Sequence, residues 1–346
     1  MLMTTNILLT DMKHYFLFIL LSAAIATGGC TEELQPQTCG TNGTVPDESE
    51  LTEAVLNLSV NAFVVEAQAE TRASIPSGTP EKETPEEKEI HNIWVFQYDA
   101  ATKELLIKPR YYTITDQAML QDLPVYLKAG VPSVVYVVTN TGYDNWANDG
   151  TDSSWQKFKQ LEQLKKQTLP TAFPLRSIDK VSIPMAGASE EVEVTTGITV
   201  TVPVTRMYAK LKVKVEMRKA EMELNNVNVR QIPNICRVET LAGDGKGEPM
   251  EPVPFPDETT FSSIAFAASD LEKNEDKEWA VFYVPENLQG ETQTQGGNKS
   301  DAAPSNALVV DITTEIGGER YLYAAYPGGN SLNNFNIQRN QVYRIT

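Results

Sequence analysis

The sequence predicts a mainly β protein made of two β-rich units, with one short helix in the first unit. Apolar and polar residues alternate in residues 56–64 and 207–217, and this period of two is typical of half-buried strands. Residues 133–140 (SVVYVVTN) are apolar on both faces, as in a central strand. The length of 346 residues favours two domains once a targeting segment is set aside.

Charge and histidine content narrow the class of function. The net charge is −17, and a surface that acidic repels phosphate backbones, so we expect no nucleic-acid partner. Only His14 and His91 are present, and His14 falls in the targeting segment, which excludes a histidine-pair metal site. We therefore expect no enzyme, no metal and no cofactor. Acidic residues are too numerous, however, for counting alone to decide against a pair of catalytic carboxylates.

Residues 1–29 are predicted to be a lipoprotein signal peptide. A charged start at Met12, the more natural first residue, precedes an apolar run over 15–25 that is short for a membrane span. The run ends in small residues before Cys30, which resembles a bacterial lipoprotein signal and predicts lipid attachment at Cys30. Thr27 departs from this pattern, because an aliphatic residue is usual there. The alternative is an ordinary signal peptide followed by a chance cysteine.

The next three segments suggest a removable strand. Residues 30–50 are polar and are interpreted as a flexible tether, and residues 51–72 as the first strand. Three prolines and five glutamates in residues 73–89 argue against packing and predict a soluble, acidic linker. The basic Arg72–Ala73 bond is the predicted processing site. The predicted inward face of the strand, which would act as a donor-strand face, consists of Leu56, Leu58, Val60, Ala62 and Val64.

The first domain, residues 51–203, continues as β structure with one helix. Helical spacing of Trp155, Phe158, Leu161 and Leu164 predicts an amphipathic helix over 152–167. The other strands are expected over residues 90–98, 105–115, 123–127, 133–140 and 192–204.

The second domain is expected over residues 204–346. Its clearest strand is 207–217, where Lys210, Lys212 and Lys214 alternate with apolar residues and are interpreted as a solvated sheet face. Further strands are expected over residues 221–229, 281–284, 307–313 and 321–326. Cys39 and Cys236 could form a disulfide or remain two unrelated thiols.

Short motifs follow one another in a recognisable order along the chain. After the signal and first strand come residues 71–73 (TRA), the acidic linker, 93–96 (IWVF), 204–211 (VTRMYAKL), 283–288 (YVPENL), 326–330 (YPGGN) and 335–340 (FNIQRN). This ordered set resembles the fimbrillin-type lipoproteins of Bacteroidetes, the subunits of type V pili, over nearly all of the mature chain.

The resemblance implies two transthyretin-like β-sandwich domains and a structural role in a fimbria that supports adhesion. It implies export as a lipoprotein to the outer surface of the cell outer membrane, where a trypsin-like protease would cut after an arginine, here Arg72. Lys82 and Lys88 are alternative basic sites. The vacated groove would accept a strand of a neighbouring fimbrial subunit, and the chain would then belong to the fimbrium. Stalk, tip and anchor roles, and any host or bacterial surface ligand, stay open; the chain stops within an expected strand at Thr346.

The alternative function is that of a surface glycan-binding lipoprotein with β-sandwich modules. Such modules stack sugars on exposed aromatic side chains, for which Trp146, Trp155 and Trp279 are the candidates. Exposed coplanar aromatics would favour glycan binding, whereas a buried first strand in a long groove would favour the fimbrial role.

Overall fold

The structure, a computed structural model, describes most of the chain beyond residue 50. The described residues are 51–65, 83–142, 144, 146–147, 154–171, 176–177, 182–217, 219–239, 251–271, 278–292 and 298–346. All of them belong to one compact unit, residues 37–346. Within these ranges, no helix combines the length and the apolar character needed to cross a membrane.

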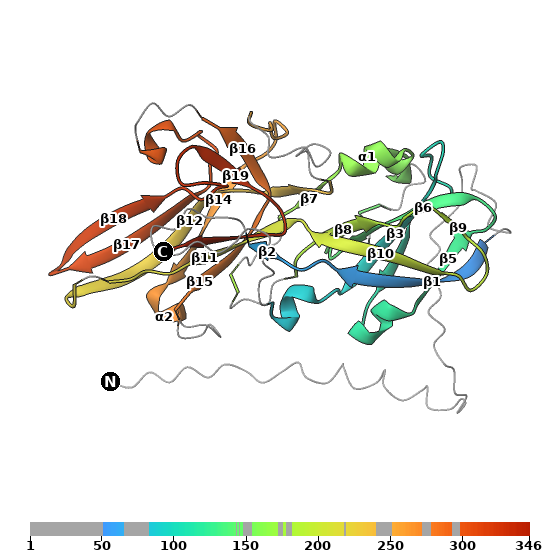
Figure 1. The fold of residues 1–346 in the computed structure, drawn as a ribbon, viewed down its shortest axis with the longest axis horizontal. Coiled ribbons are helices and arrows are strands. Elements are labelled where there is room, and N and C mark those ends of the chain that lie inside the picture. The colour runs from blue at the N-terminus through green and yellow to red at the C-terminus, as the bar shows by residue number, and fades with distance from the viewer. Residues whose placement is uncertain are drawn as a thin grey trace, which may run out of the picture. The chain divides into compact units, whose positions relative to one another are not determined.

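The largest sheet has eight strands and is formed by the part of the chain before Met207 (Figure 1). Its order is β4-β3-β6-β8-β10-β1-β5, and β9 pairs with β6. The first strand, β1, lies one place in from the edge of this sheet. The strands are β1 (Leu51–Val60), β3 (Asn92–Asp99), β4 (Arg110–Thr113), β5 (Leu123–Lys128), β6 (Pro132–Thr139), β8 (Met185–Ala188), β9 (Val192–Glu193) and β10 (Thr199–Arg206).

Two four-stranded sheets and two strand pairs follow. One sheet has the order β15-β11-β20-β2 and the other β14-β12-β17-β18, while β13 pairs with β7 and β16 with β19. Both β2 and β7 come from the N-terminal half of the chain. The strands are β2 (Val64–Val65), β7 (Thr168–Pro170), β11 (Tyr208–Val213), β12 (Met222–Pro233), β13 (Ile235–Arg237), β14 (Phe261–Ala267), β15 (Ala280–Pro285), β16 (Asn287–Glu291), β17 (Val309–Ile316), β18 (Glu319–Ala325), β19 (Asn334–Ile337) and β20 (Gln341–Ile345).

The helices are short, and the predicted helix over 152–167 is wrong in its length. The segment folds as two pieces, η4 and α1, because a β-bridge between Glu104 and Gln160 interrupts it. The N–H of Leu161 donates to the carbonyl of Lys103, so this hydrogen bond connects the segment to another part of the chain instead of continuing a helix. The helices are η2 (Pro85–Lys88), η3 (Gln117–Gln121), η4 (Ser154–Phe158), α1 (Leu161–Lys165), α2 (Ala268–Leu271) and η5 (Lys299–Ala302).

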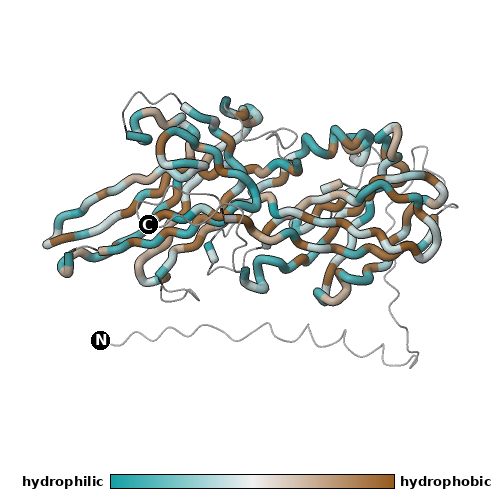
Figure 2. Tube along the Cα trace, viewed as in Figure 1, coloured by the Kyte–Doolittle hydropathy of each residue, from teal (hydrophilic) through white to brown (hydrophobic). Residues whose placement is uncertain are grey.

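The buried apolar residues form two clusters, and the mainly β class is confirmed. One cluster belongs to the eight-stranded sheet and includes Leu56, Leu58 and Val202. The other runs from Phe63 through Trp94 to Tyr343 and therefore draws on both halves of the chain. Figure 2 shows hydrophobic and hydrophilic residues alternating along the strands, as half-buried sheets require. The break between the two sheet systems falls at Met207, and the expected boundary at 203/204 lies inside β10.

Candidate functional site

The first strand is the part of the predicted site that the structure describes. Cys30, Cys39, Arg72 and Ala73 lie outside the described residues. Cys236 is a buried free cysteine whose Sγ lies 3.9 Å from the Met207 Sδ. Burial raises the pKa of this thiol to about 12, so it stays protonated at neutral pH.

β1 is held on both sides by other strands. It pairs in parallel with β10, where Leu56 lies opposite Val200, and antiparallel with β5, where the same residue lies opposite Leu123. Both Leu56 and Leu58 are buried, at 0% and 3% exposure. Removal of β1 would therefore leave an apolar groove bordered by two rows of unpaired backbone groups.

The first strand is shorter than predicted, because the chain changes sheets after Val60. β2 pairs with β20 in the second sheet system, so a single strand does not continue through residues 61–63. This turn reverses the expected alternation: Ala62 is exposed, whereas Phe63 is fully buried. Val60 and Val64 are half-buried. Sequence periodicity missed Phe63 because it assumed an unbroken strand.

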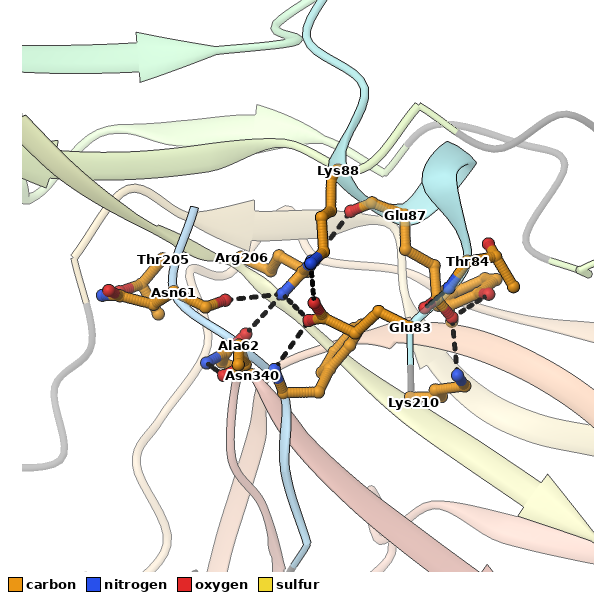
Figure 3. A network of polar contacts seen from close by, with 12 residues as sticks. Asn61, Ala62, Glu83, Thr84, Glu87, Lys88, Thr205, Arg206, Lys210 and Asn340 are labelled. Atoms are coloured by element: carbon orange, nitrogen blue, oxygen red, sulfur yellow. Dashed lines mark hydrogen bonds and ion pairs between the residues drawn. The ribbon is translucent and has the colours of Figure 1, made fainter. Parts of the chain in front are cut away.

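Side chains bind three backbone groups of this crossing (Figure 3). The Arg206 Nη1 donates to the carbonyl of Asn61 at 2.7 Å, and the Asn340 amide donates to the carbonyl of Ala62, also at 2.7 Å. The N–H of Phe63 donates to the Glu83 carboxylate at 2.8 Å. The crossing is therefore fixed by side chains from three distant parts of the chain, and we name Glu83, Glu87, Arg206, Lys210 and Asn340 the junction cluster.

Charge is buried and paired within the junction cluster. The Arg206 side chain is fully buried and lies 2.9 Å from Glu83 Oε1, and its Nε donates to the Glu87 carbonyl at 2.8 Å. Lys210 Nζ lies 2.7 Å from Glu87 Oε1, with both side chains almost completely buried. Burial lowers the pKa of Arg206, although the carboxylates of Glu83 and Glu87 oppose that effect. Buried charges of this kind are stable only as partners of one another.

Phe63 packs against the cations of the cluster. The Arg206 guanidinium lies 4.2 Å from the centre of the Phe63 ring, and Lys210 Nζ lies 5.7 Å from it. Such cation–π contacts gain strength when they are removed from water. The crossing is thus anchored by an aromatic side chain as well as by backbone hydrogen bonds.

Two sequence interpretations need correction here. The last residues of the segment interpreted as a soluble linker are packed, since η2 places Glu87 at 3% exposure. Lys210 is not part of a solvated face, because it is 5% exposed and paired with Glu87. Acidic residues beside prolines predicted an unpacked segment. The carboxylates of Glu83 and Glu87 are nevertheless buried, because they pair with the buried cations of Arg206 and Lys210.

We expect the junction cluster to weaken in acid. Burial would raise the pKa of Glu83, but hydrogen bonds from Lys88 and Phe63 and the charge of Arg206 leave this pKa below its ordinary value of 4.5. The stabilisation from Glu83 is therefore complete above pH 4.5 and is lost as the pH falls through the lower folded-state pKa. Denaturant unfolding at several pH values should show this loss, and it should be smaller in Glu83→Gln. Equal acid sensitivity of both proteins would contradict the assignment.

The motif at residues 283–288 and the motif at residues 335–340 lie next to each other in the fold. Glu286, from residues 283–288, accepts two hydrogen bonds from the Arg339 guanidinium at 3.1 and 3.2 Å, and β16 pairs with β19. Arg339 also donates to the carbonyls of Arg237 and Val238. Burial would lower the pKa of Arg339, but Glu286 outweighs it and leaves that pKa raised. The motifs therefore form one structural unit, and their residues are used in packing.

The glycine and asparagine residues of the PGGN motif shape a tight loop. A Cβ on Gly328 would lie 2.0 Å from the Asn334 carbonyl oxygen, so only glycine fits there. Asn330 Oδ1 accepts hydrogen bonds from the N–H groups of Leu332, Asn333 and Asn334. This loop positions β19 against β16.

The three tryptophans proposed for glycan stacking do not form a platform. The Trp146 ring packs edge-on against Phe158 at 5.1 Å, next to the core. Trp155 is only partly exposed, and Trp279 packs against the core with Lys212 Nζ 5.0 Å from its ring centre. In Trp146 and Trp279 these contacts use ring surfaces that a sugar would need.

Comparisons with known proteins concern the same motifs and fold. Residues 282–346 match a family model described as Domain of unknown function (DUF4906). This range includes the motifs at residues 283–288, 326–330 and 335–340. No curated protein matches the chain. Among solved structures it is similar to the tip fimbrial protein Mfa3 from Porphyromonas gingivalis with C-terminal truncation, at 14% identity and a TM-score of 0.48, covering 86% of this chain and 95% of that chain.

Two other solved structures are also similar. One is a fimbrial assembly protein from Parabacteroides distasonis ATCC 8503, at 16% identity and a TM-score of 0.44, covering 85% of this chain and 89% of that chain. The other is the fimbrial anchor protein Mfa2 from Porphyromonas gingivalis, at 13% identity and a TM-score of 0.35, covering 80% of this chain and 82% of that chain. All three of these solved structures are described as fimbrial proteins.

Proposed function

We propose that this chain is a structural, non-enzymatic subunit of a cell-surface fimbria that supports adhesion. It is exported as a lipoprotein through Cys30, is anchored in the outer membrane at the cell surface, and is assembled with other fimbrial subunits by strand exchange. Each half, 51–203 and 204–346, acts as a transthyretin-like sandwich. The ordered sequence motifs support this family of functions.

The observation that carries the strand-exchange step is the position of β1. It is paired on both sides, it fills an apolar groove with Leu56 and Leu58, and it leads into the segment that contains Arg72. A cut after Arg72 would separate residues 30–72 from the rest of the chain. The groove would then accept a strand from another subunit, which satisfies the exposed backbone groups and the apolar surface together.

The acceptor groove would keep the whole junction cluster after such a cut, because all five of its residues follow Arg72 in the chain. Glu83, Arg206 and Asn340 all follow Arg72 in the chain, so the groups that hold residues 61–63 would stay with the folded body. An incoming strand would meet the same donors and acceptors. This supports exchange of one strand for another of similar pattern.

The proposal is tested by intact-mass and N-terminal analysis of the protein on cells, with and without an arginine-specific protease. We expect a new N-terminus at Ala73 and a ladder of SDS-resistant multimers after treatment. Arg72→Ala should abolish both, whereas Lys82→Ala should abolish neither. A lipidated Cys30 that persists without any ladder would overturn the strand-exchange step.

A further inference from the structure

The outer strand of one sheet, β18, is unusually apolar for an exposed edge. It is the terminal strand in the order β14-β12-β17-β18, and Figure 1 shows it running beside β17. Tyr321, Leu322 and Tyr323 are 40%, 66% and 49% exposed. Soluble proteins normally protect such edges with prolines, bulges or charges because an open edge can pair with another chain.

The hairpin turn decides which backbone groups face outward. Ile316 pairs with Glu319 across the two residues Gly317 and Gly318, whose φ angles of 58° and 87° are those of a tight hairpin turn. Residues that flank a two-residue turn form a hydrogen-bonded pair, and such pairs then alternate along the ladder. Tyr321 and Tyr323 therefore bond to β17. The N–H and C=O groups of Arg320, Leu322 and Ala324 point to the open edge.

We propose that this edge pairs with the same edge of a second copy, antiparallel about a two-fold axis at Leu322. In this register Leu322 lies opposite Leu322 of the other copy, and Arg320 lies opposite Ala324. All three outward-facing residues of each strand then form hydrogen-bonded pairs. The contact needs no cleavage and no strand exchange, so it is independent of the proposed function.

The side chains suit this register. Tyr321 of one copy lies opposite Tyr323 of the other in non-hydrogen-bonded pairs, where side chains are closest and aromatic pairs are favourable. On the opposite face Leu322 meets its own copy. No like charges lie directly opposite one another, because Arg320 of one copy lies opposite Ala324 of the other and Glu319 lies opposite Ala325. The tyrosines also extend the face that carries Ile312, which packs against the core.

A second copy fits this surface better than a sugar does. An oligosaccharide would use the tyrosine rings but not Leu322 on the other face or the row of outward backbone groups. A second β-strand would contact the tyrosine rings, Leu322 and the outward backbone groups together. The edge is short, so we expect a weak contact, below about 1,200 Å² of buried surface.

Disulfide trapping tests the register in the full chain with Cys30→Ser and Cys39→Ser, where Cys236 is buried. Leu322→Cys should cross-link to itself, because hydrogen-bonded pairs have Cα atoms about 5.5 Å apart, within disulfide range. Tyr321→Cys and Tyr323→Cys should each fail alone, since their own copies would lie about 8 Å apart. A mixture of these two variants should give a cross-linked dimer.

Analytical ultracentrifugation of the protein with its unmodified β18 sequence tests whether two copies associate at all. Leu322→Pro removes an outward N–H and the leucine side chain but no hydrogen bond to β17, and an edge strand tolerates proline at such a position. It should abolish concentration-dependent dimers and shift the unfolding midpoint only slightly. Equal self-cross-linking of all three cysteine variants, or dimers that persist in Leu322→Pro, would overturn the proposal. A protein that stays monomeric at about millimolar concentration, with or without bound oligosaccharide, would also overturn it.

Discussion

Arg206→Met should lower the free energy of unfolding by about 3–5 kcal/mol, because it leaves buried charge without its partner. Arg206 contacts Glu83 at 2.9 Å and donates to the carbonyls of Asn61 and Glu87. Methionine has a similar length but offers none of these donors, so the buried acceptors would lose hydrogen bonds as well as charge. Denaturant unfolding measures the loss, and hydrogen exchange of residues 60–65 should locate it.

Two further variants separate this effect from a general loss of packing. Lys165→Met removes an exposed ion pair with Glu162 and should cost less than about 1 kcal/mol. Adding Glu83→Gln to Arg206→Met should recover part of the loss, because the unpaired carboxylate is gone while an acceptor for the Phe63 N–H remains. If Arg206→Met costs no more than the Lys165 variant, the junction cluster does not fix the crossing.

Leu56→Asp should detach β1 from the sheet. The side chain is fully buried, and an isolated carboxylate there would cost more than about 4 kcal/mol. The remaining strands β10 and β5 would become edges around an empty groove. We expect β1 amides to lose protection from hydrogen exchange, and the unfolding midpoint to fall.

A peptide in trans distinguishes an open groove from a collapsed protein. A synthetic peptide of residues 51–65 should bind Leu56→Asp and restore part of the exchange protection of β10 and β5. Asn57→Asp is the matched control, since this residue lies on the other face of β1 and is only half-buried. If β1 stays protected in Leu56→Asp, the strand is not held by its apolar face.

Local patterns predicted the strands well, because burial on one face leaves a period of two in the sequence. Alternation identified β1 and β11, and a continuous apolar run identified β6. Their lengths were less predictable. The segment 207–217 alternates throughout, yet β11 ends at Val213, because the strands that pair with it end there.

The polar core of the candidate site could not be predicted from local patterns. Glu87 and Lys210 look like ordinary surface residues until the fold brings them to 2.7 Å. The same holds for Phe63, whose burial depends on a crossing held by Arg206 and Asn340. One signal was available: Arg206 occupies an apolar strand end that leads directly into another strand, a place where a charge needs a partner.

The bond between Asn340 and the Ala62 carbonyl joins residues that are 278 positions apart. Among the described strands, β2 likewise pairs with β20 alone, at residues 341 and 342. As the chain is synthesised from its N-terminus, the bonds of Asn61 and Phe63 to Arg206 and Glu83 can form first, whereas the Ala62 carbonyl and β2 must wait for Asn340 and β20. Contacts of such long range form late in folding. The order of synthesis therefore leaves the crossing only partly fixed until β20 has been made.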